Sequence, residues 1–192
     1  MGLEFELKYR ADAGALERIA AAFPGEYAVI PMTTSYFDTP EGALSQRHWT
    51  LRHRMEGDRH VCTLKTPAES MGRGEWECEC ADIETALPVL AKLSGLGELT
   101  ELAENGIIQT CGARFTRKAL LIPIGESTAE LALDQGVLLN GSRELSFCEA
   151  EVELKSGSRA EILAFGQLFA AKFGLTPEPK SKYARARALG KE

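Results

Sequence analysis

Charged residues recur at every second position in several segments of the chain, and this alternation strongly limits the folds that the sequence can adopt. In one such segment Glu149, Glu151 and Glu153 alternate with alanine, valine and leucine. The charged members of all these sets are Glu4, Glu6 and Lys8; Arg52 and Arg54; Glu75, Glu77 and Glu79; Glu130 and Asp134; and Glu149, Glu151 and Glu153. Alternate side chains of a β-strand share one face, so this period predicts strands that each carry one ionic face.

Turn signals and helical periodicity predict the remaining elements. Strands are expected at 3–9, 27–38, 43–55, 59–66, 74–80, 106–124, 128–139 and 144–154, and helices at 11–23, within 83–102 and at 159–173. Strands outnumber helices and follow one another in hairpins, which predicts the α+β class with a mainly antiparallel sheet. A sheet of seven or eight strands tends to curl or close, because closure hides its edges.

Length, composition and net charge limit the class of protein to which the chain can belong. With 192 residues and 44% hydrophobic composition, the chain is expected to form a single domain over residues 1–192. Its net charge of −6 argues against nucleic acid as a partner. No apolar run reaches the roughly 20 residues that cross a bilayer, and the N-terminus is charged where a secretory signal is apolar. We therefore expect a cytoplasmic protein without a membrane partner, either a monomer or a homodimer.

The five cysteines predict no disulfide framework, because their number is odd and they lie in expected strands. Cys78 and Cys80 form a Cys-x-Cys pair, but neither a second cysteine pair nor a closely spaced histidine pair accompanies it in the sequence. Buried, reduced cysteines are the expectation.

The ionic faces have a simple alternative interpretation for any one strand, which is a solvated outer surface. Five such strands together favour a functional interpretation. Three like charges in a row, as at Glu149 to Glu153, repel one another unless a cation lies among them. Basic residues on other strands supply the opposite sign that a bound polyanion requires; these are Lys8, Arg52, Arg54 and Lys65. The two sets together suit a metal ion and a phosphate chain.

Read in order, these segments resemble the CYTH superfamily, the triphosphate tunnel metalloenzymes, and within it most closely the bacterial inorganic triphosphatases. Glu4-Phe5-Glu6-Leu7-Lys8 is similar to the ExExK motif of that superfamily. The segments that follow it in order are Ser35 to Thr39, Leu51 to Arg54, Thr63 to Lys65, Arg73 to Glu77, Phe115 to Arg117, Glu130 to Gly136, Glu149 to Leu154 and Ser181 to Tyr183. The resemblance thus covers almost the whole chain.

The resemblance implies an eight-stranded antiparallel β-barrel, or tunnel, with helices packed outside it. It implies Mg²⁺ or Mn²⁺ as the cofactor and a small anionic substrate, with tripolyphosphate hydrolysed to pyrophosphate and phosphate. The implied metal-side carboxylates are Glu4, Glu6, Asp134, Glu149, Glu151 and Glu153. The implied phosphate clamp consists of Lys8, Arg52, Arg54, Lys65, Arg117 and Lys182, with Arg114 as a second choice to Arg117. Among these, Glu4, Glu6, Lys8 and Lys65 are the residues that we expect to carry catalysis.

Several alternatives stay open at this point. Arg114 and Arg117 lie in opposite strand phases, so only one of them can face the tunnel unless a bulge intervenes. Glu75 and Glu77 could pair with arginines instead of binding metal. The same scaffold could hydrolyse thiamine triphosphate or cyclise ATP as class IV adenylyl cyclases do. A non-catalytic polyphosphate-binding module is the alternative from another class.

Overall fold

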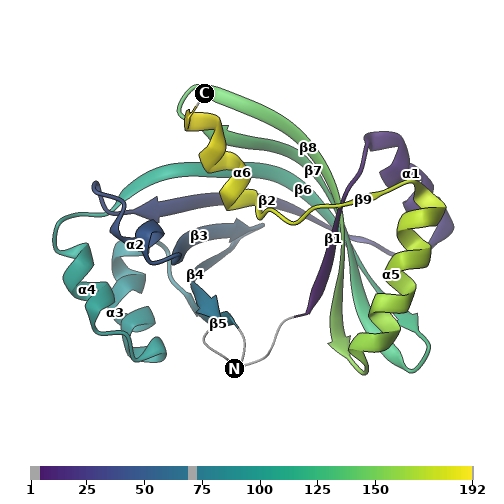
Figure 1. Ribbon diagram of the computed structural model, residues 1–192, viewed down its shortest axis with the longest axis horizontal. Coiled ribbons are helices and arrows are strands. Elements are labelled where there is room, and N and C mark those ends of the chain that lie inside the picture. Colours follow the sequence, from purple (N-terminus) through teal and green to yellow (C-terminus); the bar gives the residue numbers. More distant parts are fainter. Residues whose placement is uncertain (1–4, 69–72, 192) are drawn as a thin grey trace.

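The computed structural model describes residues 5–68 and 73–191, and these form one antiparallel sheet of nine strands with helices on both sides (Figure 1). The strand order is β5-β4-β3-β2-β6-β7-β8-β1-β9. Their bounds are β1 Glu6–Arg10, β2 Ala28–Asp38, β3 Thr50–Glu56, β4 Arg59–Ala68, β5 Arg73–Glu79, β6 Ile108–Ile124, β7 Ser127–Asn140, β8 Arg143–Ser156 and β9 Thr176–Pro177.

The helices are α1 Ala13–Ala22, α2 Ala43–Gln46, α3 Ile83–Ser94, α4 Glu98–Ala103, α5 Arg159–Phe173 and α6 Lys182–Ala188, followed by a 3₁₀ turn at Leu189–Lys191. Asp12 caps α1, because its side chain accepts a hydrogen bond from the backbone N–H of Ala15 at 2.6 Å. No helix among the described residues is long and apolar enough to cross a membrane.

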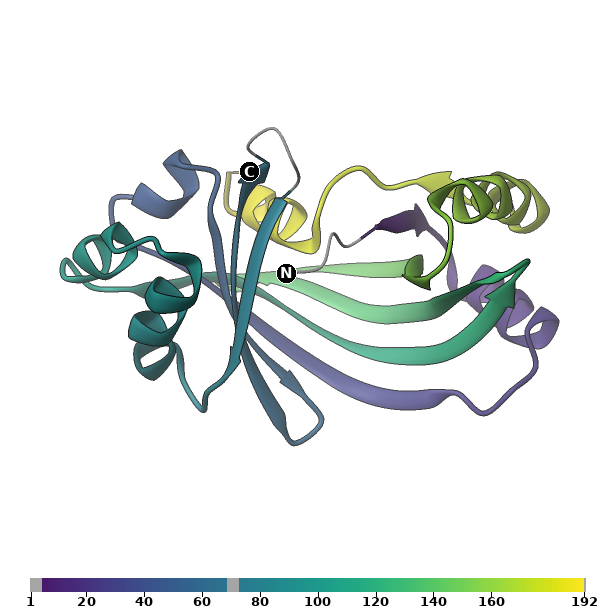
Figure 2. The ribbon, with the colours of Figure 1, turned by 90° about the horizontal axis from the view of Figure 1, so that it is seen from below.

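The sheet curls so that one face is concave (Figure 2). Gly136 supports this bend in β7, because a Cβ atom there would lie 2.2 Å from the carbonyl oxygen of Arg114 on β6. The described residues contain no pairing between β5 and β1, so backbone hydrogen bonds leave the curl open at that seam. The expected α+β class with a curled antiparallel sheet is confirmed, and the two-residue β9 adds a ninth strand.

Helices cover the convex face at both ends of the sheet (Figure 1). At one end, α1 and α5 pack on β6, β7 and β8 through a cluster that includes Ile19, Leu131, Val152 and Phe169. At the other end, α2, α3 and α4 lie over β3, β4 and β5. Apolar residues of these strands are therefore buried under the helices, and Lys8 on β1, Arg54 on β3 and Glu151 on β8 lie on the concave face.

Helix α6 lies on the concave face instead. Ala186 packs there with Phe115, Leu138 and Phe147, and the side-chain amide of Asn140 donates to the carbonyl of Ala186 at 3.1 Å. The basic end of the chain is therefore an internal element that crosses the curl.

One expected strand begins later than the sequence suggests. Residues 43–46 form α2, and β3 begins only at Thr50. The buried carboxylate of Asp38 causes this difference, because it accepts from the backbone N–H groups of Leu44 at 2.8 Å and Ser45 at 3.2 Å. Such a cap satisfies the donors that an isolated helical turn leaves open.

Candidate active site

Strand register arranges the ionic residues of β1, β7 and β8 in rows across the concave face. Glu6 on β1 lies opposite Glu153 on β8, and Glu153 lies opposite Glu130 on β7. In the next row Lys8 lies opposite Glu151. Because directly opposed side chains in an antiparallel pair have Cβ atoms roughly 5 Å apart, each row forms one ionic patch.

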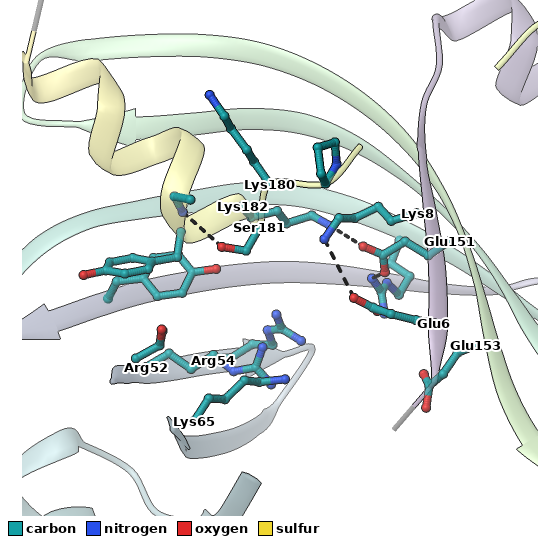
Figure 3. A pocket seen from close by; sticks show the side chains of 16 residues that line it. Glu6, Lys8, Arg52, Arg54, Lys65, Glu151, Glu153, Lys180, Ser181 and Lys182 are labelled. Carbon is teal, nitrogen blue, oxygen red and sulfur yellow. Dashed lines mark hydrogen bonds and ion pairs between the residues drawn. The ribbon is translucent and has the colours of Figure 1, made fainter. Parts of the chain in front are cut away.

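These rows form one wall of a cavity of about 520 Å³ between the concave face and α6. Figure 3 shows Glu6, Glu151 and Glu153 on this wall, and Arg52, Arg54 and Lys65 facing them from β3 and β4. Other lining residues are Lys8, Tyr36, Thr50, Arg117 and the segment Pro179, Lys180, Ser181, Lys182, Tyr183 and Ala184. Among the described residues the lining holds seven basic and three acidic side chains, which is a surplus of four positive charges in a chain whose net charge is −6.

Threonines on neighbouring strands hold the two arginines of the basic wall. The Nε atom of Arg54 donates to the hydroxyl of Thr34 at 3.1 Å, and Nε of Arg52 donates to the hydroxyl of Thr63 at 3.1 Å. Both threonines are buried. Each arginine therefore has its Nε edge fixed, and its terminal nitrogens are directed toward the cavity and its acidic neighbours.

Within residues 5–68 and 73–191, the guanidinium of Arg54 has a single, long ion pair, in which a terminal nitrogen lies 3.7 Å from a carboxylate oxygen of Glu56. Burial, assisted by repulsion from the like charge of Arg52, lowers the pKa of Arg54 to about 10. A buried cation in this state gains stability from any anion that reaches it.

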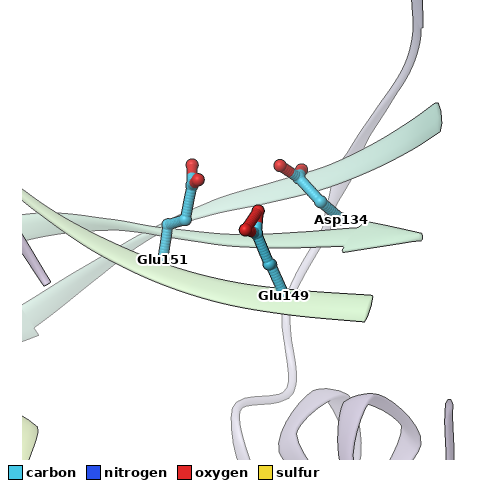
Figure 4. A group of neighbouring side chains, drawn as sticks. All are labelled: Asp134, Glu149 and Glu151. Carbon is cyan, nitrogen blue, oxygen red and sulfur yellow. The ribbon is translucent and has the colours of Figure 1, made fainter. Parts of the chain in front are cut away.

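Asp134 on β7 lies opposite Glu149 on β8, in the row after Glu151. These three carboxylates meet the side chain of Lys182 from α6. Asp134, Glu149 and Glu151 point toward one another from β7 and β8 (Figure 4), and their ligand oxygens lie within 4.8 Å of one another. The ammonium of Lys182 lies 2.8 Å from Asp134, 2.6 Å from Glu149 and 2.8 Å from Glu151. A protein cation therefore already occupies this acidic triad.

Arginines complete the neutralisation of the triad. Arg117 donates from Nε and a terminal nitrogen to both oxygens of Asp134 at 2.8 Å, and it also bonds Glu151. Arg185 bonds Glu149 from the far side. The network is buried, so its members depend strongly on one another.

The pKa directions in this network have a common cause. Burial alone would raise the pKa of Glu151, but Lys182 and Arg117 outweigh it and hold that pKa well below its usual range. Burial raises the pKa of Glu149, and Lys182 offsets this only in part. Burial would lower the pKa of Lys182, but the three carboxylates raise it. The two glutamates of the triad are therefore shifted in opposite directions, and Glu149 is easier to protonate than Glu151.

The residues expected to form the site divide into four groups. Those that line the cavity are Glu6, Lys8, Arg52, Arg54, Lys65, Arg117, Glu151, Glu153 and Lys182. Asp134 and Glu149 lie behind the lining, with no exposed surface. Arg114 lies outside the cavity, 65% exposed and 3.8 Å from Glu144, because the register of β6 turns its phase outward and that of Arg117 inward. Glu4 lies outside the described residues.

Contacts answer the open alternative for Glu75 and Glu77. Lys65 bonds Glu75 at 2.7 Å, and Arg52 lies 3.3 Å from Glu77, so both carboxylates pair with cavity cations. His53 points to the convex side, where its Nε2 atom lies 3.1 Å from Nδ1 of His60.

Sequence reasoning did not assign Lys180, Tyr183 or Arg185 to the site. Lys180 and Tyr183 line the cavity, with the Tyr183 ring 5.1 Å from that of Tyr36. Arg185 lies three residues after Lys182, and this helical spacing was the available signal that both side chains share a face.

The residues present also fit a divalent metal ion. Glu6 and Glu153 are opposed carboxylates that face the cavity, and Glu151 is in the neighbouring row. Carboxylate oxygens are the ligands that Mg²⁺ and Mn²⁺ prefer. The buried triad could also hold a cation, but Lys182 would first have to leave it.

The curled sheet and its mixed ionic lining define an α+β protein of the tunnel type with a charged interior. The CYTH domain family matches residues 2–186, and the chain belongs to this family. An inorganic triphosphatase from Haemophilus influenzae is 28% identical over 169 residues, which are 86% of this chain and 47% of that protein. The chain thus spans about half the length of this relative.

Solved structures share the fold. The Hippeastrum protein HpAC1, described as an adenylyl cyclase candidate with a dominant triphosphatase activity, superposes with a TM-score of 0.70 at 21% identity, over 97% of this chain and 96% of that one. PH1819 from Pyrococcus horikoshii superposes with a TM-score of 0.64 at 19% identity, over 98% and 99% of the two chains.

Proposed function

We propose that this protein hydrolyses a short linear triphosphate, with inorganic tripolyphosphate as the first candidate, and that Mg²⁺ or Mn²⁺ is required. The observation that carries the proposal is the surplus of four positive charges around one cavity of an acidic protein. Tripolyphosphate carries about four to five negative charges at neutral pH, so the cavity lining offsets the cost of removing it from water.

Each wall has a separate part in this reaction. Arg52 and Arg54 bind phosphate oxygens through terminal nitrogens, because their Nε edges are held by threonines. Lys8 lies between the two walls and contacts Glu6 at 3.7 Å, so it can follow a phosphate group. Positioning and charge stabilisation supply most of the catalysis in phosphoryl transfer, so the site needs no protein nucleophile.

Glu6, Glu151 and Glu153 would hold the metal ion, with Glu4 as a further candidate from outside the described residues. When bound, such an ion neutralises phosphate oxygens and lowers the pKa of a coordinated water. Asp134 and Glu149 act differently in this proposal: they hold Lys182 and thereby fix α6 against the cavity.

Phosphate release from tripolyphosphate, thiamine triphosphate and ATP, measured with and without Mg²⁺ or Mn²⁺, tests the proposal. We expect metal-dependent release of one phosphate per tripolyphosphate, with pyrophosphate as the other product. Cyclic nucleotide and pyrophosphate from ATP would favour the cyclase alternative. HpAC1, which shares the fold, is described as an adenylyl cyclase candidate. Binding of tripolyphosphate without turnover under any metal would favour the non-catalytic module.

A further inference from the structure

A second cavity, of about 400 Å³, is lined by another face of α6 than the cavity described above. The first turn of α6 lines the first cavity, whereas Arg185, Ala188 and Leu189 line the second. The spacing i, i+3 and i+4 places these three side chains on one face of the helix. Helix α6 therefore separates two cavities, and Lys180 in the segment before it lines both.

The second cavity exists because β1 ends before it has covered the whole length of β8. Strand β1 ends at Arg10, and Ala11 makes the last backbone contact, donating to the carbonyl of Cys148 at 3.0 Å. In the described part of the chain, no strand pairs with that side of β8 before Cys148. Leu145, which lines the cavity on this part of β8, is therefore left 46% exposed.

One part of the lining is apolar. Phe147 is buried, and Leu145, Ala188 and Leu189 line the same cavity. This wall is fixed in place, because Arg143 donates to the carbonyl of Leu189 at 2.6 Å and so ties the end of α6 to β8. A preformed apolar wall of this kind is typical of sites for small organic molecules, and the volume of the cavity is within their usual range.

The other part of the lining is basic. Arg10, Lys180 and Arg185 contribute three positive charges, and Glu178 contributes one negative charge. Figure 3 shows the side chain of Lys180 extending away from Glu6 and Arg54 of the first cavity. The lining thus has a surplus of two positive charges, which matches the roughly two negative charges of a phosphomonoester at neutral pH.

The basic groups are held around the buried carboxylate of Glu178. This carboxylate bonds Nε of Arg10, accepts from the backbone N–H of Lys180 at 2.9 Å and lies 3.7 Å from a terminal nitrogen of Arg185. The other terminal nitrogen of Arg185 bonds Glu149. Its Nε atom is buried and has no hydrogen-bond partner within residues 5–68 and 73–191. A buried donor without a partner costs stability, so this guanidinium gains from a further acceptor.

We propose that the second cavity binds a small organic phosphomonoester. Its phosphate group would contact Arg10, Lys180 and Arg185, and its organic body would cover Leu145 and Phe147. An inorganic anion would leave the apolar wall exposed to water, and an uncharged organic molecule would leave the surplus cations without a counter-ion. The proposal concerns binding alone, so it does not depend on whether the first cavity hydrolyses a triphosphate.

Titration of the full chain with phenyl phosphate in the absence of divalent metal, followed by the amide signals in nuclear magnetic resonance spectra, tests the location. We expect saturable shifts of the amides of residues 145–148 on β8 and 185–189 at the end of α6. Orthophosphate, which lacks the ring, and phenol, which lacks the phosphate, should each bind at these amides at least about tenfold more weakly. Shifts confined to β3 and β4 of the first cavity, or equal affinity for phenyl phosphate and orthophosphate, would overturn the proposal.

A pair of matched variants tests the assignment to this cavity. Leu145→Glu places a carboxylate on the apolar wall at a partly exposed position, so the fold should persist while phenyl phosphate binds at least about tenfold more weakly at the amides of residues 185–189. Leu168→Glu is the control, because Leu168 is 74% exposed on α5 and lines neither cavity. Equal affinity of the two variants for phenyl phosphate at these amides would also refute the site.

Discussion

Replacement of Lys182 by methionine tests the ionic network at the base of the cavity. The variant keeps much of the side-chain length but removes the ammonium that lies within 2.8 Å of three buried carboxylates. Arg117 and Arg185 remain, so two cations face Asp134, Glu149 and Glu151 and one carboxylate loses its counter-ion. Removing one partner of a buried ionic group typically costs about 3–5 kcal/mol.

The loss of stability in Lys182→Met should depend on pH, because the carboxylate that has lost its counter-ion can take up a proton. Glu149 is the natural acceptor, since burial already raises its pKa above the ordinary value of 4.5. Protonating such a group in the folded protein costs about 1.4 kcal/mol for each pH unit above its unfolded pKa. This cost sets an upper limit on the loss of unfolding free energy in Lys182→Met, which is about 5 kcal/mol at about pH 8 and about 1.4 kcal/mol at about pH 5.5. A carboxyl whose folded pKa is raised destabilises the fold above its unfolded pKa, so the loss must grow as the pH rises.

Urea unfolding followed by far-ultraviolet circular dichroism measures the free energy of unfolding at the two pH values. Lys180→Met is the matched control, because Lys180 lies two residues earlier, lines the same cavity and is exposed. We expect the control to change the free energy of unfolding by less than about 0.5 kcal/mol at either pH. A loss in Lys182→Met that is below about 1 kcal/mol, or that is the same at both pH values, would refute the reasoning.

The remaining predictions concern the cavity. Glu6→Gln should lower kcat on the order of a hundredfold while tripolyphosphate still binds by calorimetry; an unchanged kcat would remove Glu6 from the metal side. Arg54→Ala should lower kcat/KM by about ten- to a hundredfold, whereas Arg59→Ala on the same hairpin, exposed and outside the cavity lining, should not. Thr34→Val should raise KM several-fold by releasing the Nε edge of Arg54, and Thr34→Ser should restore it; equal KM values in the two variants would argue against a positioning role.

Much of the fold could be predicted because one local signal repeats. The alternation at Glu149, Glu151 and Glu153 predicted both a strand and the shared face of these side chains, and β8 confirms both. The α2 segment could not be predicted in this way, since its cap is the carboxylate of Asp38, which lies at the end of the preceding strand β2. Periodicity describes a segment and its faces, but it contains no information about donors and acceptors elsewhere in the chain.

The residues that form the candidate site could be predicted better than their positions relative to one another. Arg114 and Arg117 could not be separated until the pairing of β6 with β7 determined the inward phase. The basic end of the chain resembled a solvated helix, because the counter-ions of Lys182 lie 31 to 48 positions earlier, at Glu151 and Asp134.

The crowding of cations around the cavity also affects the protein when no substrate is bound. Arg54 is buried and is repelled by the like charge of Arg52, so the folded state carries an electrostatic strain that the unfolded chain can relieve by spreading out. Any multivalent anion in solution, sulfate or orthophosphate included, lessens this strain by association with the folded form alone. The thermal stability of this protein is therefore a property of the protein and its buffer together, and the choice of buffer anion in purification and storage becomes a structural variable.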